Sequence, residues 1–576
     1  MPTRSEVQVM LTGPGGMFEV VPEVIDGVAL KVYKNRMMSL REVAAAARIR
    51  GDTETFMVYG DRRYGFGTFL SLADLVSETL VTQYGIQRGD RVAVLSANNP
   101  EWCLTFWGTV NMGAILVGLN GWWNTNEILY GLQDSGSRVL IADRNRFARI
   151  ARDLDQLPHL DAVFLIDADP GDFGDDNRLH RFDNLLDSRS AGPPTTPIDE
   201  SDAAVIFYTS GTTGRPKGAI STHRSMIANL QNTIYNAVAG TMITAGPDDS
   251  GGSALGSIAQ ATALLTSPLF HVSGCHSGLV VGLFAGIKLV IPVGKFDPET
   301  AMRLIQEEQI SVWATVPTMV WRVVEHPARD GYDLSSVAQV AYGGSPSAAE
   351  LQRQVKATFP NVKSIGNAYG LTESSSVLTV NSGPDAVERP DSVGLPMPTV
   401  DLRIVDFDGT SLPAGQTGEV WAKGPLIMPG YWGKPDATAE TVTDGWLHTG
   451  DVGYLDEDGF LYITDRAKDM VIRGGENIYC VEIENRLVEH PEILDAAVIG
   501  VPHPTLGEEV KAVVQVAPGS SLLPSAVQSW VAETLANFKV PAYVEVSTDA
   551  LPRNASVKLL KNVLRGSGEV SFAETL

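Results

Sequence analysis

Residues 208–218 read Tyr-Thr-Ser-Gly-Thr-Thr-Gly-Arg-Pro-Lys-Gly and follow an apolar run at 203–207, which is the layout of a strand followed by a phosphate-binding loop. Glycines let a backbone approach an anion closely, hydroxyl and loop N–H groups donate to it, and a lysine adds positive charge. A flexible linker is the alternative interpretation of a short glycine-rich stretch, and the spacing is not that of a Walker A loop. The complete string favours phosphate binding by Thr209, Ser210, Gly211, Thr212, Thr213, Gly214 and Lys217.

The composition limits the partners of the protein. The chain has 576 residues, a formal net charge of −24 and 44% apolar residues. A chain of this length forms about two to four domains. The negative charge argues against nucleic acid or an anionic membrane as a partner, so a site for an anionic cofactor has to be locally basic.

The cysteines and the apolar segments indicate the cellular compartment. Cys103, Cys275 and Cys480 lie far apart, with neither a metal-binding spacing nor a disulfide framework, so we expect a reducing compartment, the cytoplasm. The first residues contain no apolar signal segment. The longest apolar stretch, 279–293, contains Lys288 and is too short to span a bilayer, so we expect no integral membrane segment.

Apolar strands alternate with amphipathic helices over most of the chain, which predicts parallel sheets covered by helices. The predicted strands are 91–95, 139–142, 163–166 and 311–316, and the predicted helices are 100–119 and 300–309. The polar segment 169–202 is predicted to be a surface connection, and 246–257 a glycine- and serine-rich loop.

The pattern changes after about residue 465. Two apolar strands, 496–501 and 510–516, precede a helix whose apolar face contains Val527, Val531 and Phe538. These elements predict a separate, smaller α+β module.

Five further motifs follow the glycine-rich loop. In chain order they are Asn367-Ala368-Tyr369-Gly370-Leu371-Thr372-Glu373, Gly445-Trp446-Leu447-His448-Thr449-Gly450-Asp451, Asp465-Arg466-Ala467-Lys468-Asp469, Gly474-Gly475-Glu476-Asn477 and Leu551-Pro552-Arg553-Asn554-Ala555-Ser556-Val557-Lys558. Together with the loop they resemble the motifs of the adenylate-forming superfamily, which includes acyl-CoA synthetases, aryl-CoA ligases, luciferases and peptide-synthetase adenylation domains. The resemblance extends from about residue 50 to about residue 562.

The resemblance implies an α/β fold with a large N-terminal body of layered, mostly parallel sheets and a small α+β lid. Residues 1–467 would form the adenylate-binding and acyl-pocket domain, and residues 468–576 a mobile C-terminal lid that turns about Lys468. The implied enzyme is an AMP-forming carboxylic acid–CoA ligase that uses ATP, Mg²⁺ and coenzyme A. Attack of the carboxylate on the α-phosphate makes an acyl-adenylate, and a thiol then takes the acyl group.

The resemblance also assigns residues to the nucleotide. Glu373 and Thr213 would hold Mg²⁺, and Thr372 would donate to the α-phosphate. Asp451 would accept the ribose hydroxyls, with Arg466 beside it. The adenine would be enclosed by Tyr369 and the backbone of Gly343, Gly344 and Ser345. Asn367, Ala368 and Gly370 also belong to the implied cofactor-binding site.

Three more assignments concern the acid and the thiol. His271 matches the family's gate between the acyl pocket and the nucleotide, although a lone histidine beside an apolar strand is often a core residue. Gly474, Gly475 and Glu476 would form a tight turn beside the pantetheine arm, and an ordinary hairpin turn fits them equally well. Lys558 would bridge the carboxylate and the α-phosphate during adenylation.

Val557 departs from the family pattern, because a glycine usually precedes the catalytic lysine. A β-branched residue disfavours a positive φ, at a cost of about 1–3 kcal/mol if the loop requires one. An enzyme specialised for the thioester half-reaction, starting from a preformed adenylate, is therefore one alternative. Transfer to a carrier-protein phosphopantetheine is another, and a non-enzymatic adenylate-binding homologue is a third. The oligomeric state is open, a homodimer included.

The acid itself is constrained by composition. By resemblance the pocket walls are 271–278, 315–319, 341–345 and 367–372, which contain no lysine or arginine to receive a second carboxylate. We therefore expect a fairly hydrophobic acid.

Overall fold

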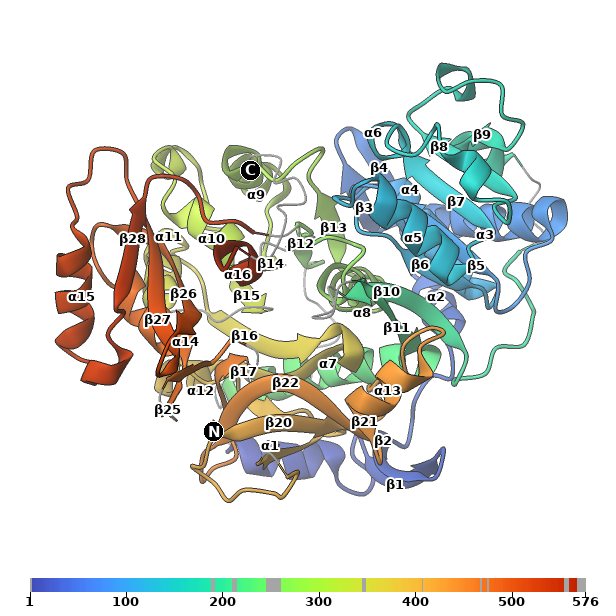
Figure 1. Ribbon diagram of the computed structural model, residues 1–576. Helices are drawn as coiled ribbons and strands as arrows, with labels where there is room; N and C mark the ends of the chain where they lie inside the picture. The colour runs from blue at the N-terminus through green and yellow to red at the C-terminus, as the bar shows by residue number, and fades with distance from the viewer. Residues whose placement is uncertain are drawn as a thin grey trace.

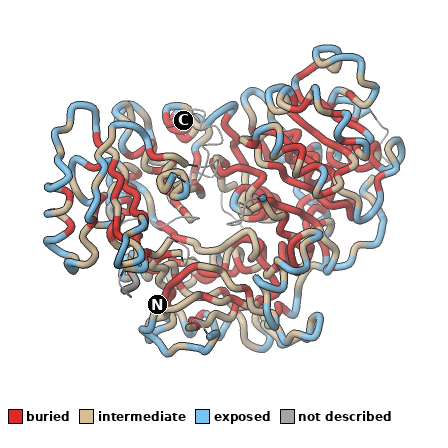
Figure 2. The backbone as a smooth tube through the Cα atoms, viewed as in Figure 1, coloured by how far each residue is buried: buried red, intermediate tan, exposed pale blue. Residues whose placement is uncertain are grey.

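The computed structural model describes residues 3–187, 192–209, 215–244, 260–343, 349–406, 408–466, 469–473, 476–553 and 559–566. Figure 1 shows several sheets, with the C-terminal one at the opposite side of the molecule from the first large sheet. Buried segments concentrate in the strands and in the helices that separate the sheets (Figure 2).

The first large sheet carries the predicted phosphate loop at one edge. Its strand order is β11-β10-β6-β5-β7-β8-β9, and every pair is parallel except β10–β11. The strands are β5 (Arg91–Leu95), β6 (Ile115–Gly118), β7 (Val139–Asp143), β8 (Ala162–Ile166), β9 (Leu179–Arg181), β10 (Ala203–Thr209) and β11 (Lys217–Thr222). Thr209 and Lys217, which flank the loop, are paired in the antiparallel ladder.

The second large sheet carries the Tyr-Gly-Leu-Thr-Glu motif. Its order is β18-β17-β16-β15-β14-β12-β13-β3-β4, with parallel pairing from β16 to β3 and antiparallel pairing at both ends. The strands are β3 (Thr55–Tyr59), β4 (Arg62–Gly65), β12 (Thr262–Leu264), β13 (Lys288–Ile291), β14 (Val312–Thr315), β15 (Gln339–Gly343), β16 (Ser364–Leu371), β17 (Ser376–Ser382) and β18 (Leu395–Pro396).

Helices between and around these sheets form the core. One continuous apolar cluster joins both sheets through α2 (Leu40–Arg48), α3 (Phe66–Tyr84), α4 (Pro100–Asn111) and α8 (Val281–Ala285). Trp102 and Trp107 of α4 are fully buried in it. Asn99 caps α4 by accepting from the N–H of Trp102 at 2.8 Å, and Pro100 at the first position fixes its start. The helix α7 (His223–Thr244) contributes Met226, Ile227 and Leu230 to the same cluster. Outside this core lie α5 (Thr125–Ser135), α6 (Arg144–Phe147), α9 (Pro298–Glu308), α10 (Pro317–Val324), α11 (Ala349–Thr358) and α12 (Pro384–Glu388).

A third, antiparallel sheet completes the body. Its strands are β19 (Asp401–Val405), β20 (Gly418–Lys423), β21 (Val442–Thr443), β22 (Trp446–Leu455) and β23 (Leu461–Arg466), and α13 (Pro435–Thr441) lies beside β21. In the β22–β23 ladder Asp451 is paired with Arg466. The sequence analysis predicted mostly parallel sheets and did not predict this one.

The C-terminal elements form the predicted smaller α+β unit. They are β24 (Val471–Arg473), β25 (Glu476–Ile478), α14 (Cys480–Val488), β26 (Ile493–His503), β27 (Gly507–Val516), α15 (Pro524–Ala532), β28 (Tyr543–Ser547) and α16 (Lys561–Leu564). The strands form a sheet with an apolar cluster of its own, shared with α14 and α15. The exact limits of two domains stay a prediction.

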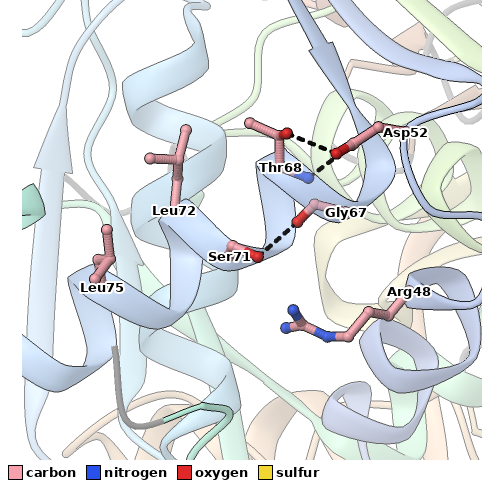
Figure 3. Close-up of a pocket in the computed structure, with 7 residues that line it drawn as sticks. All are labelled: Arg48, Asp52, Gly67, Thr68, Ser71, Leu72 and Leu75. Carbon is pink, nitrogen blue, oxygen red and sulfur yellow. Dashed lines mark hydrogen bonds between the residues drawn. The ribbon is translucent and has the colours of Figure 1, made fainter. Parts of the chain in front are cut away.

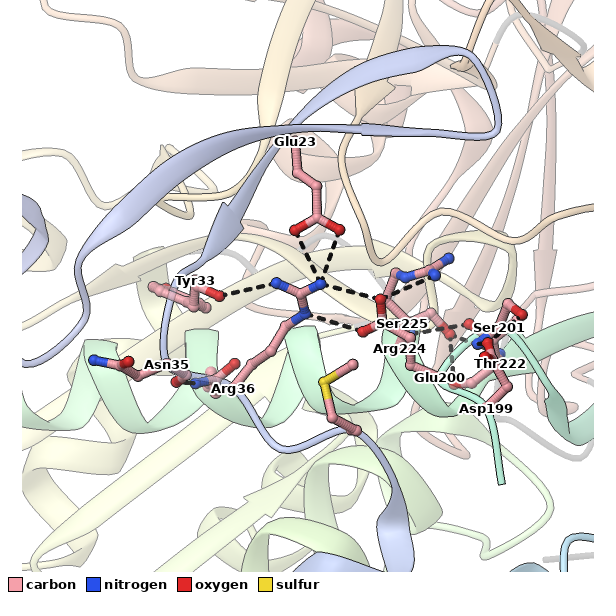
Figure 4. Close-up of polar contacts among 12 residues, drawn as sticks. Glu23, Tyr33, Asn35, Arg36, Asp199, Glu200, Ser201, Thr222, Arg224 and Ser225 are labelled. Atoms are coloured by element: carbon pink, nitrogen blue, oxygen red, sulfur yellow. Dashed lines mark hydrogen bonds and ion pairs between the residues drawn. The ribbon is translucent and has the colours of Figure 1, made fainter. Parts of the chain in front are cut away.

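The N-terminal segment is attached to the body by a buried ion network. This N-terminal segment consists of the helix α1 (Arg4–Thr12) and a hairpin formed by β1 (Val20–Ile25) and β2 (Val28–Tyr33). The Glu200 carboxylate, 8% exposed, accepts from Arg36 at 2.9 and 3.0 Å and pairs with Arg224 at 3.0 Å (Figure 4). Arg36 also reaches Glu23 of β1 at 3.0 Å, so the hairpin is tied to the start of α7.

Several predicted elements need correction. The helix predicted at 100–119 ends at Asn111, because Gly113 turns the chain with φ of +80° into β6. The connection predicted at 169–202 contains β9, the edge strand of the first sheet. The helix predicted at 527–538 ends at Ala532, and Phe538 lies in a separate 3₁₀ turn. The predicted loop 246–257 lies outside the described residues.

Among the described residues, no helix is both long and apolar enough to cross a membrane. Cys103, Cys275 and Cys480 are all buried and free.

Candidate active site

The Asp451 carboxylate is fixed by two donors from different elements. The Tyr369 hydroxyl, from the end of β16, donates to Oδ2 at 2.7 Å, and Arg466 Nε lies 2.9 Å from Oδ1. The Asp451 side chain is 5% exposed and the Arg466 side chain 40% exposed, so the arginine is the more accessible partner of the pair. Burial, together with Asp451, raises the pKa of Tyr369, and Asp451 raises the pKa of Arg466. A carboxylate has about four acceptor positions, so two remain for ribose hydroxyls.

The Glu373 carboxylate is held differently, since its one donor among the residues that the structure describes is neutral. Glu373 lies in the 3₁₀ turn Thr372–Ser374 that follows β16, and its Oε1 accepts from the Tyr431 hydroxyl at 2.9 Å. Burial, with Glu373 beside it, raises the pKa of Tyr431, so the phenol stays protonated. The Lys217 ammonium lies 5.1 Å from the centroid of the same tyrosine ring. One ring therefore contacts both the predicted metal ligand and the predicted phosphate lysine.

The segment 428–432 brings Tyr431 to this position. Its backbone bonds β11 on one side, where Trp432 N–H donates to Gly218 at 2.8 Å and Ile220 N–H donates to Gly430 at 3.2 Å. On the other side Met428 N–H donates to the Glu373 carbonyl at 2.8 Å. Sequence reasoning missed Tyr431, although a glycine followed by Tyr431-Trp432 in a turn between strands was a visible signal.

The base of the phosphate loop is anchored by Asp134 of α5. Its carboxylate accepts from Tyr208 at 3.0 Å and from Tyr130 at 3.2 Å, and it pairs with Lys434 at 2.7 Å. Since Tyr208 precedes Thr209, this contact fixes the strand end from which the loop departs. Thr209 and Lys217 are half-buried at the two ends of the loop, whereas Ser210, Gly211, Thr212, Thr213 and Gly214 lie outside the described residues.

The predicted adenine residues lie on neighbouring strands β15 and β16. Gly343 is paired with Ala368, and a Cβ at Gly343 would come within 2.4 Å of the Ala368 carbonyl oxygen, so a side chain is excluded. Asn367 is buried. A Cβ at Gly370 would come within 1.7 Å of the Ser376 carbonyl, which explains the glycine in the motif by chain packing. Thr372 starts the turn that contains Glu373, and Gly344 and Ser345 lie outside the described residues.

His271 lies at the entrance to an unusual helix. It precedes a π-helix at Ser273–Val280, a rare form that occurs often at functional sites. The rings of His271 and Phe270 are 4.8 Å apart, and Phe270 contacts Trp122 edge-on at 5.2 Å. His271 is partly exposed, as a gate requires, and its gating role stays a prediction.

The lid residues are only partly described. Lys468, Gly474, Gly475, Val557 and Lys558 lie outside the described residues, and the side chain of Glu476 does too. The residues that flank the two glycines, Arg473 and Glu476, are paired in an antiparallel ladder.

A shallow pocket elsewhere contains none of the motif residues. It lies along α2 and the start of α3, and Figure 3 shows Asp52 accepting hydrogen bonds from Thr68 at its rim. Its lining residues are Arg48, Asp52, Gly67, Thr68, Ser71, Leu72 and Leu75.

The residues fit Mg·ATP. In the part of the chain that the structure describes, no group of three His, Cys, Asp or Glu could enclose a metal. Mg²⁺ does not require one, because it usually takes one or two carboxylates, substrate phosphates and water. A carboxylate held by a neutral phenol, beside a lysine, suits that ion together with a polyphosphate.

Comparison with known proteins agrees with this geometry. The AMP-binding enzyme family matches residues 43–432, and the AMP-binding enzyme C-terminal domain matches residues 482–558. The chain belongs to the AMP-binding enzyme family. The superfamily predicted from the six motifs is thereby confirmed.

Three similar proteins illustrate the range of the family. A feruloyl-CoA synthase of Amycolatopsis sp is 34% identical over 508 residues, which cover 87% of this chain and 94% of that protein. A fatty acid–[acyl-carrier-protein] ligase, ScoC of Streptomyces coeruleorubidus, is 34% identical over 486 residues, covering 84% and 87%. The crystal structure of the anthranilate CoA ligase AuaEII in complex with anthranoyl-AMP superimposes with a TM-score of 0.82 at 25% identity, covering 92% and 97%.

Proposed function

We propose that this enzyme, an AMP-forming acid–CoA ligase that uses ATP, Mg²⁺ and coenzyme A, performs both half-reactions on a hydrophobic carboxylic acid. The observation that carries the proposal is the placement of two tyrosine-held carboxylates, Asp451 within β22 and Glu373 in the turn after β16, with Lys217 beside the second. This arrangement offers an acceptor for the ribose, a ligand for the cation and a contact for the phosphates in one candidate site.

The first half-reaction joins a carboxylate oxygen of the acid to the α-phosphorus, and the bond from that phosphorus to pyrophosphate breaks. Asp451 and Arg466 would orient the ribose, and Glu373 would hold the Mg²⁺ that neutralises the pyrophosphate. Thr213 would be a second Mg²⁺ ligand, and Lys558 would approach the α-phosphate. In the second half-reaction the thiol of coenzyme A attacks the acyl carbon and AMP leaves. Lys468 would be the hinge between the two arrangements.

The acid is inferred from the chemistry of the predicted pocket and from the relatives. The ranges 271–278, 315–319, 341–345 and 367–372 offer no cation for a second carboxylate. The names of the similar proteins refer to feruloyl, fatty acyl and anthranoyl groups. Each of the corresponding acids combines one carboxylate with an apolar body. The three buried free cysteines support a reducing compartment, and we propose the cytoplasm.

A panel assay tests the proposal. Ferulate, dodecanoate, anthranilate and succinate are each supplied with Mg·ATP, and pyrophosphate and acyl-CoA are measured separately with coenzyme A or a phosphopantetheinylated carrier protein. We expect turnover of at least one hydrophobic acid and little turnover of succinate. Pyrophosphate release with none of these acids would contradict the proposal, as would preference for succinate.

The specialised thioester-forming enzyme is the second candidate, and Val557 is the observation that favours it. If the valine restricts the approach of Lys558, Val557→Gly should raise pyrophosphate release up to about tenfold while leaving acyl-CoA formation from synthetic adenylate unchanged. An unaltered adenylation rate in Val557→Gly would contradict this second candidate and would support the ordinary two-step ligase.

A further inference from the structure

A buried cluster of hydroxyl groups connects three parts of the candidate active site. The serine cluster consists of Ser221, Ser225, His276, Ser277, Ser375 and Ser376. Ser221 lies on β11, the strand that starts at Lys217, and Ser225 lies on α7. The histidine and Ser277 lie in the π-helix that follows His271, and the last two serines come two and three residues after Glu373. The π-helix, α7 and β17 pack against one another here.

The hydrogen bonds of the cluster run from the π-helix to the Glu373 turn. Ser277 and Ser376 share a hydrogen bond of 2.7 Å between their hydroxyl oxygens. The His276 ring lies 3.0 Å from the Ser221 hydroxyl, which is 3.2 Å from that of Ser375. Ser375 is also 2.9 Å from Ser225.

Two of these serines have backbone conformations that side chains rarely adopt. Ser375 has φ of +49° and Ser376 has φ of +113°. Such conformations are unfavourable for residues with a side chain and persist only where the surroundings fix them. Here the surroundings are the hydroxyl contacts just described, together with Ser374, whose hydroxyl lies 2.9 Å from the Ser376 carbonyl.

The strained turn bears directly on Glu373. Only Ser374 separates Glu373 from the strained pair, and the Ser376 carbonyl lies against Gly370 of the same motif. A change in the position of Ser376 therefore moves the backbone that carries the Glu373 carboxylate.

The cluster has no separate chemistry of its own. His276 is fully enclosed, burial lowers its pKa to about 3, and its Nδ1 has no partner among the described residues. The buried His276 ring is bonded to Ser221, so it links β11 to the π-helix and is not exposed to a substrate. The function of the cluster has to lie in what it connects.

We propose that Ser277 and Ser376 are positioning residues that couple binding of the acid along the π-helix to the placement of Glu373, and hence to binding of Mg·ATP. The proposal rests on the proposed function, because that function puts the acid beside His271 and the metal at Glu373. When the acid packs against the π-helix, the 2.7 Å contact transmits its position to the strained turn. Coupled sites in proteins typically change each other's affinity about 5- to 150-fold.

The test measures binding of the magnesium complex of α,β-methylene-ATP, which releases no pyrophosphate, with and without the acid that the wild-type enzyme turns over fastest. We expect the acid to tighten nucleotide binding about tenfold in the wild type. In Ser277→Ala and Ser376→Ala this factor should fall to about twofold or less, while nucleotide affinity without acid changes less than about threefold.

Ser376→Gly separates positioning from stability. Glycine adopts φ of +113° without strain, so this variant should keep or raise the melting temperature while it loses the coupling. Ser336→Ala is the matched control, because it removes a partly buried hydroxyl that donates to a carbonyl at 2.8 Å far from the motifs.

A coupling factor near one in the wild type, or a wild-type factor in both alanine variants, would overturn the proposal. Coupling that follows the melting temperature across Ser376→Ala and Ser376→Gly would overturn it too, since the cluster would then be structural only. Failure of the proposed function is a different result, namely no pyrophosphate release by the wild type with any acid of the panel.

Discussion

Two carboxylates in the same site are each held by a tyrosine, yet they differ in charge balance. Asp451 accepts from Tyr369 and also pairs with the Arg466 guanidinium at 2.9 Å. Within the described residues Glu373 accepts from Tyr431 alone, while the nearby cation Lys217 lies on the face of the tyrosine ring.

The difference indicates which ligand each carboxylate suits. A carboxylate neutralised by a guanidinium attracts little further positive charge but still accepts hydrogen bonds, so Asp451 suits the uncharged hydroxyls of a ribose. A carboxylate held by a neutral phenol keeps its charge and suits Mg²⁺. The predictions below test this contrast.

The largest expected effects come from neutralising each carboxylate without changing its shape. Glu373→Gln should lower kcat/KM on the order of 10²-fold, because a charge that holds the metal in the transition state is lost. Asp451→Asn should raise the KM for ATP about tenfold with a smaller effect on kcat, because an amide replaces one acceptor oxygen by a donor. Steady-state pyrophosphate release measures kcat and KM of both variants. Equal effects on kcat in the two variants would contradict the different roles assigned to Glu373 and Asp451.

Lys217→Ala should raise the KM for Mg·ATP about tenfold, since a phosphate contact is lost while the Tyr431 ring stays in place. Lys434→Ala is the matched control, because this lysine is also near the loop but pairs with Asp134 at 2.7 Å. If both variants raise the KM equally, the effect of Lys217 is one of general charge and the assigned contact is wrong.

The two tyrosines provide a paired comparison of smaller size. Tyr431→Phe removes the only donor to Glu373 seen among the described residues, and should raise the Mg²⁺ concentration required for half-maximal rate about three- to tenfold. Tyr369→Phe leaves Asp451 paired with Arg466, so it should change the KM for ATP and leave the Mg²⁺ requirement unaltered. A shifted Mg²⁺ requirement in Tyr369→Phe, or none in Tyr431→Phe, would contradict the comparison.

Sequence reasoning predicted the parallel cores from the alternation of strands and helices, and it named both carboxylates through the resemblance of their motifs. In the structure Asp451 lies within β22 and Glu373 in the turn after β16. Sequence reasoning missed Tyr431, because the glycine and two aromatic residues at 430–432 do not reveal a contact with Glu373, which lies 58 residues away in the chain. The antiparallel sheet escaped prediction for a related reason. The register of this sheet sets Asp451 opposite Arg466 and depends on which strands pair. The apolar and polar residues of each strand alternate as in any half-buried strand, so the sequence of a strand does not identify its partner.

Local geometry explains the remaining misses. The sequence predicts a helix that continues to residue 119, whereas the helix ends at Asn111. The prediction is too long because the following strand, Ile115–Gly118, is equally apolar and fully buried. Apolar continuity does not reveal a helix end, which here depends on the positive φ of Gly113. The strain at Ser376 is likewise invisible in a serine-rich string.

A third carboxylate, Asp465, has backbone donors instead of a tyrosine and gives the smallest predicted effect. Burial raises its pKa to about 6, against about 3.9 in an unfolded chain. The folded state therefore holds a proton that the unfolded state releases, and Asp465 lowers stability increasingly as pH rises from about 4 to about 6. Asp465→Asn cannot ionise, so its stability relative to wild type should improve by about 1 kcal/mol between pH 5 and pH 8.

Denaturant unfolding at the two pH values measures this change. Asp465→Glu is the control that keeps the ionisable group. Wild type and Asp465→Asn curves that shift in parallel with pH would show that this carboxyl does not titrate in the folded protein as described.

The most direct test of the contrast between the carboxylates applies two probes to two variants. The probes are the Mg²⁺ requirement and the discrimination between ATP and 3′-deoxy-ATP, both measured by pyrophosphate release with one acid. We predict that Glu373→Gln raises the Mg²⁺ requirement and keeps the discrimination against the deoxynucleotide. Asp451→Asn should lose the discrimination and keep the Mg²⁺ requirement. If either variant changes both properties equally, or the two effects are exchanged, charge balance does not assign the two carboxylates to their ligands.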